Sequence, residues 1–239
     1  METVGVVKEA ENAECLSPWE IEMRKPVASD DYLSLTGIAP TRVRAVLAGI
    51  PRSGTVFLWQ MLRDLFPEGG VIHTHEYLEP PGVPVICTYR DPRDCLASHW
   101  RRDRPEGAGH APREKLFWYA GMMHRFAWIF RQYRQRCSPL ILKYENVISS
   151  ELAVLQMMAD HVGRTPRHPR RIVRRHSLDA NRRLQQKSKR GEFNPETMLH
   201  SRHVGTGGVG AWRELIAERD WGLMHELLMP LMHEWGYDN

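Results

Sequence analysis

Hydrophobic positions in this chain form short aliphatic runs that alternate with longer segments of helical spacing. The runs that predict strands cover 43–48, 71–77, 83–89 and 140–146. Apolar residues three and four apart predict helices from residue 55, over 114–136 and over 219–235. Strands that alternate with helices favour an α/β fold, in which helices flank a parallel β-sheet.

Length and composition fit one such domain. The chain has 239 residues, 42% of them hydrophobic, and no segment resembles an interdomain linker. We expect a domain over 41–239, with 1–40 as an N-terminal arm or the start of the domain. The apolar runs fall far short of the roughly 18 residues of a membrane span, and the first residues lack a secretion signal. The chain is therefore expected to be cytoplasmic, without a membrane partner.

The four cysteines, Cys15, Cys87, Cys95 and Cys137, are scattered without a CxxC pair. This spacing favours reduced thiols over a disulfide framework or a zinc site.

The net charge is +4, and basic residues cluster at 90–104, 164–175 and 182–190. These clusters favour an anionic partner. Nucleic acid is one explanation for the basic run at 164–176, but the run has no interleaved aromatic residues and matches no nucleic-acid-binding module. A solvated helix face is favoured, and no nucleic-acid partner is expected.

The segment 43–62 reads as a buried strand, a tight loop and a helix, which leaves free backbone N–H groups at the helix start. Such a place attracts anions. Gly49 and Gly54 have P-loop spacing, but Thr55 and Val56 stand where a nucleoside-triphosphate P-loop has Lys and Ser/Thr. Arg52 lies inside the loop instead, which suits an anion without a metal-bridged triphosphate. Alternatively, the loop only shapes a turn and Arg52 is solvated.

A second strand, loop and helix follows at 83–98. Asp91 suits the N-cap and Pro92 the first helical position, whatever the function. Arg90 ends the strand, and Ser98 lies about two turns into the helix. Because ligands of parallel sheets bind beyond the carboxyl ends of the strands, Arg52 and Arg90 are expected on one edge, gripping two anionic groups.

Taken together, PRSGT followed by YRDPRD, with Ser98 eight residues after Arg90, resembles the sulfotransferases that use 3′-phosphoadenosine 5′-phosphosulfate (PAPS), in their small-molecule, cytosolic-type branch. The resemblance covers about 43–216 and implies a P-loop-like parallel sheet. It implies that Arg90 and Ser98 bind the 3′-phosphate. The residues implied to bind the 5′-phosphosulfate are Arg52, Ser53, Gly54, Thr55 and Val56.

Weaker matches lie downstream. The strand at 140–146 resembles the family's strand that ends in Tyr-Glu, which implies that Tyr144 contacts the nucleotide; an edge tyrosine on a core strand is the alternative. Ser177 matches an adenosine-side serine. The segment 205–215 resembles the family's closing loop, although Ala211 replaces an aspartate there. The basic pair of that loop is absent, and Arg202 compensates as a 3′-phosphate contact; a plain flexible loop is the alternative.

The predicted strand 71–77 places His73 and His75 on one face. The small-molecule branch has a Lys-Thr-His triplet here, so the resemblance implies that His75 is the catalytic base and that His73 takes the place of the lysine. Arg52 then carries more of the electrostatic stabilisation. Glu76 is the fallback base. Two histidines at this spacing also suit a metal pair or an edge-strand surface, but no third ligand follows at a recognisable spacing.

The expected reaction is an in-line transfer of the sulfuryl group from PAPS to a hydroxyl or amine of a small-molecule acceptor, without a metal. Two alternatives remain open, a P-loop kinase of a small metabolite and a non-catalytic protein that binds PAPS or its product PAP. The identity of the acceptor is not readable, because pocket loops decide it. A monomer and a homodimer remain equally open, since the family's C-terminal dimer motif has no visible match.

Overall fold

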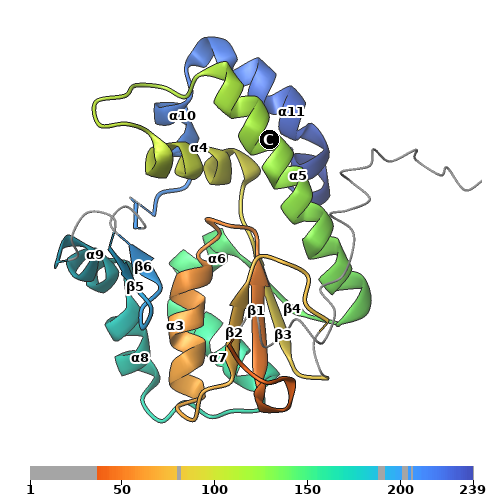
Figure 1. Ribbon diagram of the computed structural model, residues 1–239, viewed down its shortest axis with the longest axis vertical. Helices are drawn as coiled ribbons and strands as arrows, with labels where there is room; N and C mark the ends of the chain where they lie inside the picture. The colour runs from red at the N-terminus through yellow and green to blue at the C-terminus, as the bar shows by residue number, and fades with distance from the viewer. Residues whose placement is uncertain (1–36, 80–81, 188–191, 201–203, 206, 239) are drawn as a thin grey trace, which may run out of the picture.

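The computed structural model describes residues 37–79, 82–187, 192–200, 204–205 and 207–238. Within them, four parallel strands form a sheet in the order β2-β1-β3-β4 (Figure 1). The strands are β1 (Ala45–Gly49), β2 (Val71–Thr74), β3 (Val85–Tyr89) and β4 (Leu140–Lys143). The α/β class and the parallel sheet predicted from the sequence are confirmed.

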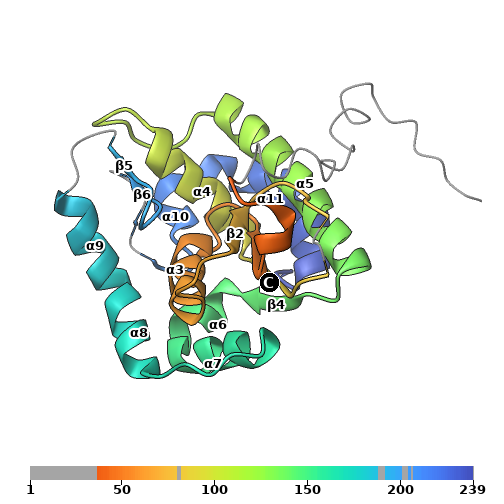
Figure 2. The ribbon, with the colours of Figure 1, turned by 60° about the horizontal axis from the view of Figure 1, so that its bottom comes forward.

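Helices cover both faces of the sheet (Figures 1 and 2). They are η2 (Pro40–Arg42), α3 (Thr55–Leu65), α4 (Pro92–Asp103), α5 (Arg113–Arg136), α6 (Tyr144–Ser149), α7 (Glu151–His161), α8 (Pro169–His176), α9 (Leu178–Lys187), α10 (Trp212–Leu215), η3 (Glu218–Asp220) and α11 (Trp221–Trp235). A separate antiparallel pair joins β5 (Phe193–Asn194) to β6 (Leu199–His200).

Successive side chains of the central strand β1 point to opposite faces of the sheet and pack into two separate hydrophobic cores. Ala45 and Leu47 of β1 pack with α3 and α7, while Val46 and Ala48 pack with α4, α5 and α11. Successive side chains of a strand point to opposite faces, so a strand buried on both faces is apolar throughout. This requirement explains the continuous aliphatic runs in the sequence.

Two predicted boundaries are wrong, and both errors fall beside the predicted site. The strand expected over 71–77 ends at Thr74, because the Thr74 hydroxyl accepts the Glu76 N–H (2.9 Å) in a tight turn. The strand expected over 140–146 ends at Lys143, and Tyr144 begins α6. Other predictions hold: α5 and α11 lie within a few residues of their expected bounds. Asp91 caps α4 by accepting the Arg93 N–H (2.9 Å).

Of the predicted arm at 1–40, residues 1–36 lie outside the described part of the chain. Among the residues that the structure describes, none of the helices has both the length and the apolar composition needed to cross a bilayer.

The topology brings the sequence motifs to one edge. All four strands are parallel, and their carboxyl ends carry the loop at 50–54, His75, Arg90 and Tyr144. Segments that lie far apart in the sequence, from the loop at 50–54 to Tyr144, therefore meet at one edge of the sheet.

Candidate active site

The loop between β1 and α3 is a rigid, strained turn. Arg52 adopts a left-handed backbone (φ 74°), which is uncommon for any residue except glycine, and Gly54 follows with φ 84°. The Ser53 hydroxyl donates to the Ile50 carbonyl (2.5 Å) and shares a hydrogen bond with Thr88 of β3. The Ser53 side chain is fully buried by these contacts. Ser53 therefore shapes the loop, and its hydroxyl is occupied within the protein.

The Arg52 guanidinium is held by α4. Its Nε donates to the Ser98 hydroxyl (2.9 Å), and Arg101, one turn further along α4, donates to the same oxygen (3.3 Å). Burial first, and then the neighbouring guanidinium groups of Arg102, Arg101 and Arg90, lower the pKa of Arg52 to about 10. The side chain stays charged at neutral pH, and the repulsion among these cations favours binding of an anion.

Arg90 adjoins the same loop. Its Nη1 donates to the Arg52 carbonyl (3.3 Å), and its Nη2 lies 3.3 Å from the buried carboxylate of Asp94. The guanidinium stacks on the Tyr144 ring, 4.2 Å from its centroid. Nε of Arg90 is buried and has no hydrogen-bond partner within the described part of the chain. A buried donor without a partner is costly, so this nitrogen is suited to a ligand oxygen.

The segment after residue 204 closes over this corner. The Gly208 carbonyl accepts from Arg90 Nη2 (2.7 Å), and the Gly207 carbonyl accepts from the Tyr144 hydroxyl (3.1 Å). The Asp94 carboxylate accepts the N–H groups of Gly210 (2.8 Å) and Trp212 (3.1 Å). Asp94 therefore connects the segment after residue 204 to Arg90, which donates to the carbonyl of Arg52 in the loop.

A cavity lies between these elements. Seven of the residues predicted to bind the nucleotide line it: Arg52, Gly54, Thr55, Val56, Arg90, Ser98 and Tyr144. Gly54 is required at its position, because a Cβ there would lie 3.0 Å from the Tyr144 ring, in addition to the strain of its positive φ. The two arginines predicted to share one ligand do face one cavity.

His75 follows β2 and, like His73, is not among the residues that line this cavity, although it lies near enough to Arg52 for their charges to interact. Its Nδ1–H donates to the Gly49 carbonyl (2.8 Å), so in the neutral ring Nε2 carries the lone pair. Burial is the main cause that lowers the pKa of His75; the Gly49 carbonyl opposes this shift, and Arg52 and Arg102 add to it. His75 is therefore a neutral imidazole whose Nε2 is ready to accept a proton.

His73 lies against His75, with ring centroids 4.8 Å apart, although only His73 belongs to the strand. Burial, followed by the proximity of His75, lowers the pKa of His73 to about 3. Its ring is neutral at physiological pH and supplies no positive charge where the resemblance implies a lysine. Glu76, the fallback base, pairs instead with Arg125 of α5 (2.6 Å).

Comparison with known proteins decides the family. The sulfotransferase-domain model matches residues 73–236, more than half of the chain. This chain belongs to the sulfotransferase family. The match begins at His73, so the loop at 50–54 lies outside it. Among curated proteins, the sequence search finds no match.

Solved structures share the fold. Mouse sulfotransferase SULT7A1 complexed with PAP is similar with a TM-score of 0.61 and 16% identity, over 80% of this chain and 85% of that one. Retinol dehydratase in complex with androsterone and inactive cofactor PAP gives a TM-score of 0.57 and 14% identity, over 85% and 84% of the two chains. The same enzyme in a complex with retinol and PAP gives a TM-score of 0.56 at 14% identity, over 85% of each chain.

The family assignment removes the kinase alternative. It leaves the role of each residue in this sulfotransferase as a prediction. Of the predicted nucleotide contacts, Ser177 does not line the cavity described above. Its hydroxyl instead accepts the Ala180 N–H (3.3 Å) at the start of α9. Arg202 lies outside the described residues.

Several cavity residues of the sulfotransferase were not found from the sequence. They are Phe57, Asp94, Arg101, Leu178 and Asn181. Helical spacing could have found Arg101, because it lies three residues after Ser98 on one face of α4. Leu178 and Asn181 come from α9, which is brought to the cavity only by the tertiary fold.

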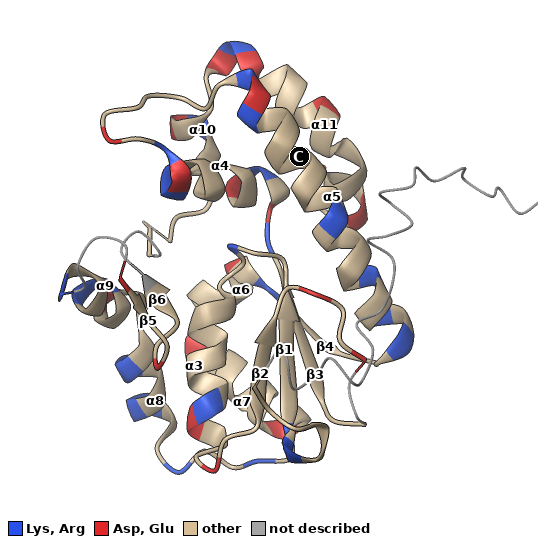
Figure 3. Cartoon of the chain, in the orientation of Figure 1, with Lys and Arg blue, Asp and Glu red and all other residues tan. Residues whose placement is uncertain are grey.

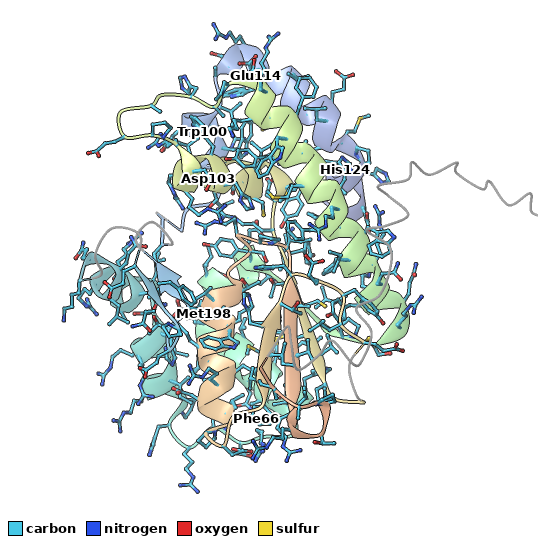
Figure 4. All side chains as sticks on the ribbon, in the orientation of Figure 1. Phe66, Trp100, Asp103, Glu114, His124 and Met198 are labelled. Atoms are coloured by element: carbon cyan, nitrogen blue, oxygen red, sulfur yellow. The ribbon has the colours of Figure 1, made fainter. Side chains whose placement is uncertain are left out.

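Helix α4 continues past Ser98 and Arg101, the two residues of this helix beyond Asp94 that line the cavity. Trp100 and Asp103, labelled in Figure 4, lie on this helix beyond Ser98. The Asp103 carboxylate accepts the Tyr119 hydroxyl (3.0 Å) and pairs with Arg102 (2.6 Å). Buried His99 stacks on the Tyr119 ring, with centroids 5.5 Å apart. The second half of α4 is therefore fixed against α5 by a ring contact and a hydrogen bond, beside a partly exposed ion pair.

The basic run at 164–176 forms α8 and the segment that precedes it, and none of its residues lines the cavity. Figure 3 shows Lys and Arg on the outer faces of α8 and α9, and Arg170, Arg171, Arg174 and Arg175 are exposed. This placement agrees with the solvated helix face favoured from the sequence. No group of three or more potential metal ligands occurs among the described residues.

Proposed function

We propose that this sulfotransferase transfers the sulfuryl group of PAPS to a hydroxyl or amine of a small-molecule acceptor, with His75 as the general base. The observation that carries the proposal is the convergence of Arg52 and Arg90 on one cavity, with His75 near enough to Arg52 for their charges to interact. Two cationic groups suit a ligand with two anionic groups.

The residues present fit such a nucleotide. Arg52 and the N-terminus of α3 are suited to the phosphosulfate, and Arg90, with Arg101 nearby, is suited to the 3′-phosphate. The buried Nε of Arg90, which has no hydrogen-bond partner within the described part of the chain, supports this assignment. PAPS supplies an activated sulfuryl group; the protein supplies positioning and charge.

His75 Nε2 accepts the proton of the attacking acceptor group, and the Gly49 carbonyl holds the ring in the required tautomer. Arg52 stabilises the negative charge that develops on the departing bridging oxygen. Because His73 is neutral, Arg52 supplies the charge that the resemblance assigns to a lysine. No divalent metal is needed for these steps.

We infer a small-molecule acceptor, because similar structures hold androsterone or retinol and because aromatic rings flank His75 here. We also propose a cytoplasmic location. The free thiols of Cys87, Cys95 and Cys137 support a reducing compartment.

The test is transfer of labelled sulfuryl from PAPS to a panel of phenols, alcohols and amines, with EDTA present. We expect product from the wild-type protein. His75→Ala should lower transfer at least about 100-fold, since it removes the proton acceptor, and should leave the affinity for PAP within about twofold. His168→Ala, at an exposed histidine before α8, is the matched control and should behave as wild type.

Two results would contradict the proposal. Tight PAP binding without turnover of any acceptor would indicate a non-catalytic binding protein. Unchanged transfer by His75→Ala would assign the base to another group.

A further inference from the structure

The last described residues of the chain return to the sheet edge that carries the site. Helix α11 ends at Trp235, the left-handed backbone of Gly236 (φ 71°) then turns the chain back, and Tyr237 follows. Helix α11 lies beside α5 (Figures 1 and 2), and Trp235 at its end contacts Tyr89 of β3, with ring centroids 6.0 Å apart. The Tyr237 side chain is partly buried there.

Tyr237 contacts two neighbouring strand ends. Its hydroxyl donates to Glu145 Oε2 (2.7 Å), and Lys143 Nζ lies over its ring, 4.0 Å from the centroid. The ring also meets Tyr89 edge to face, with centroids 6.3 Å apart. Tyr89 ends β3 and Lys143 ends β4, so one side chain bridges both strands at their carboxyl ends.

Each of these contacts adjoins a residue of the cavity. Arg90 follows Tyr89 directly, and Tyr144 lies between Lys143 and Glu145. The second oxygen of the Glu145 carboxylate, Oε1, accepts the N–H of Asp91 (3.4 Å). The Glu145 carboxylate therefore links the segment after Arg90 to the segment that carries Tyr144, and Tyr237 holds that carboxylate.

The hydrogen bond between the Tyr237 hydroxyl and the Glu145 carboxylate is of a type stronger than one between two neutral groups. A phenol that donates to an ionised carboxylate forms a charge-assisted bond. Burial first, and then Glu145, raise the pKa of Tyr237, so the hydroxyl keeps its proton and remains a donor over the physiological range.

We propose that Tyr237 is a positioning residue for nucleotide binding: by holding Glu145, it fixes Tyr144 and Arg90 in the stacked pair that faces the 3′-phosphate. The ligand named here rests on the proposed function. The arrangement of Tyr237, Glu145 and the two strand ends is a property of the protein itself.

The test is Tyr237→Phe, which removes one oxygen and keeps the ring contacts. We expect the Kd for PAP, by isothermal titration, to rise about tenfold because the stacked pair loses its support, while kcat at saturating PAPS stays within about twofold. Glu145→Ala should raise the Kd by a similar factor. The double variant should be no weaker than the weaker single variant, because both changes break one interaction.

Tyr77→Phe is the matched control. It removes the hydroxyl of another buried tyrosine, whose ring packs on Tyr133 rather than on the cavity, and it should leave the PAP affinity unchanged. The proposal is overturned if Tyr237→Phe binds PAP as wild type does, or if the effects of the two single variants multiply.

Hydrogen exchange separates this proposal from the proposed function. In the ligand-free protein, Tyr237→Phe should speed amide exchange at Asp91 and in the first turn of α6, but not in the middle of α11. Unchanged exchange at Asp91 and α6 would overturn the positioning role. A wild-type protein that fails to bind PAP would contradict the proposed nucleotide, and the exchange result would still decide the role of Tyr237.

Discussion

At the scale of single residues, one backbone carbonyl sets the chemistry of His75. The Gly49 carbonyl takes the Nδ1 proton (2.8 Å), so the neutral ring presents Nε2 as an acceptor. Burial and nearby guanidinium groups then disfavour a second proton. An imidazole of ordinary pKa thereby becomes a base that stays neutral in mildly acidic solution.

This environment has a measurable consequence for the pH dependence. Because the pKa of His75 is lowered from 6.5, the deprotonated base persists as the pH falls through that value. We expect the acid limb of kcat/KM to be centred below pH 6.5. The measurement is the pH–rate profile with PAPS and a non-ionising alcohol as acceptor. An acid limb centred above pH 6.5 would contradict the assigned environment.

Sequence reasoning worked best for residues whose neighbours are local. Arg90 at the end of β3 and Ser98 eight residues later, a spacing shared with the sulfotransferases, both line the cavity, and Asp91 was identified as an N-cap from its position alone. Ser53 shows the limit of that reasoning. Its hydroxyl bonds Thr88, 35 residues away, and no local pattern shows that β3 lies beside the loop.

At the scale of elements, Asp94 joins α4 to the closing segment. Its carboxylate pairs with Arg90 and accepts two N–H groups at the start of α10, all within a buried corner. A carboxylate with three such partners stabilises both the helix and the segment that covers the cavity.

We therefore expect Asp94→Ala to destabilise the protein and to weaken PAP binding together. Removing one partner of a buried ion pair leaves the other charge uncompensated, which typically costs about 3–5 kcal/mol. Thermal unfolding with and without PAP measures both effects. Asp64→Ala, at a partly exposed carboxylate that pairs with Arg175 on α8, is the control and should change each value little. Wild-type stability in Asp94→Ala would contradict this role.

The elements themselves were predictable where burial repeats regularly. β1 and β3 are apolar on both faces, and α5 and α11 keep a helical apolar stripe, so each was found within a few residues. The sequence predicted that β2 extends to residue 77, but the strand ends at Thr74, whose hydroxyl accepts the Glu76 N–H in a turn. The contact of Tyr144 with Arg90 depends on two strand ends meeting, and only the folded sheet shows it.

At the scale of the whole molecule, the parallel sheet gathers four separate segments at one edge and surrounds them with two cores. Positive charge at that edge is concentrated in the guanidinium groups of half-buried Arg52 and buried Arg90, with Asp94 as a buried counter-charge. Burial is the main cause that lowers the pKa of Arg52, and a ligand with two anionic groups relieves the repulsion from neighbouring guanidinium groups that adds to it.

Titration calorimetry of the wild-type protein with PAP and with 5′-AMP, both in EDTA, tests this claim most directly. The two ligands differ only by the 3′-phosphate that Arg90 is proposed to hold. We predict micromolar binding of PAP, at least about 100-fold tighter than that of 5′-AMP, with no need for Mg²⁺. Equal affinities for the two nucleotides, or binding that requires Mg²⁺, would contradict the claim that Arg52 and Arg90 bind two anionic groups of one nucleotide.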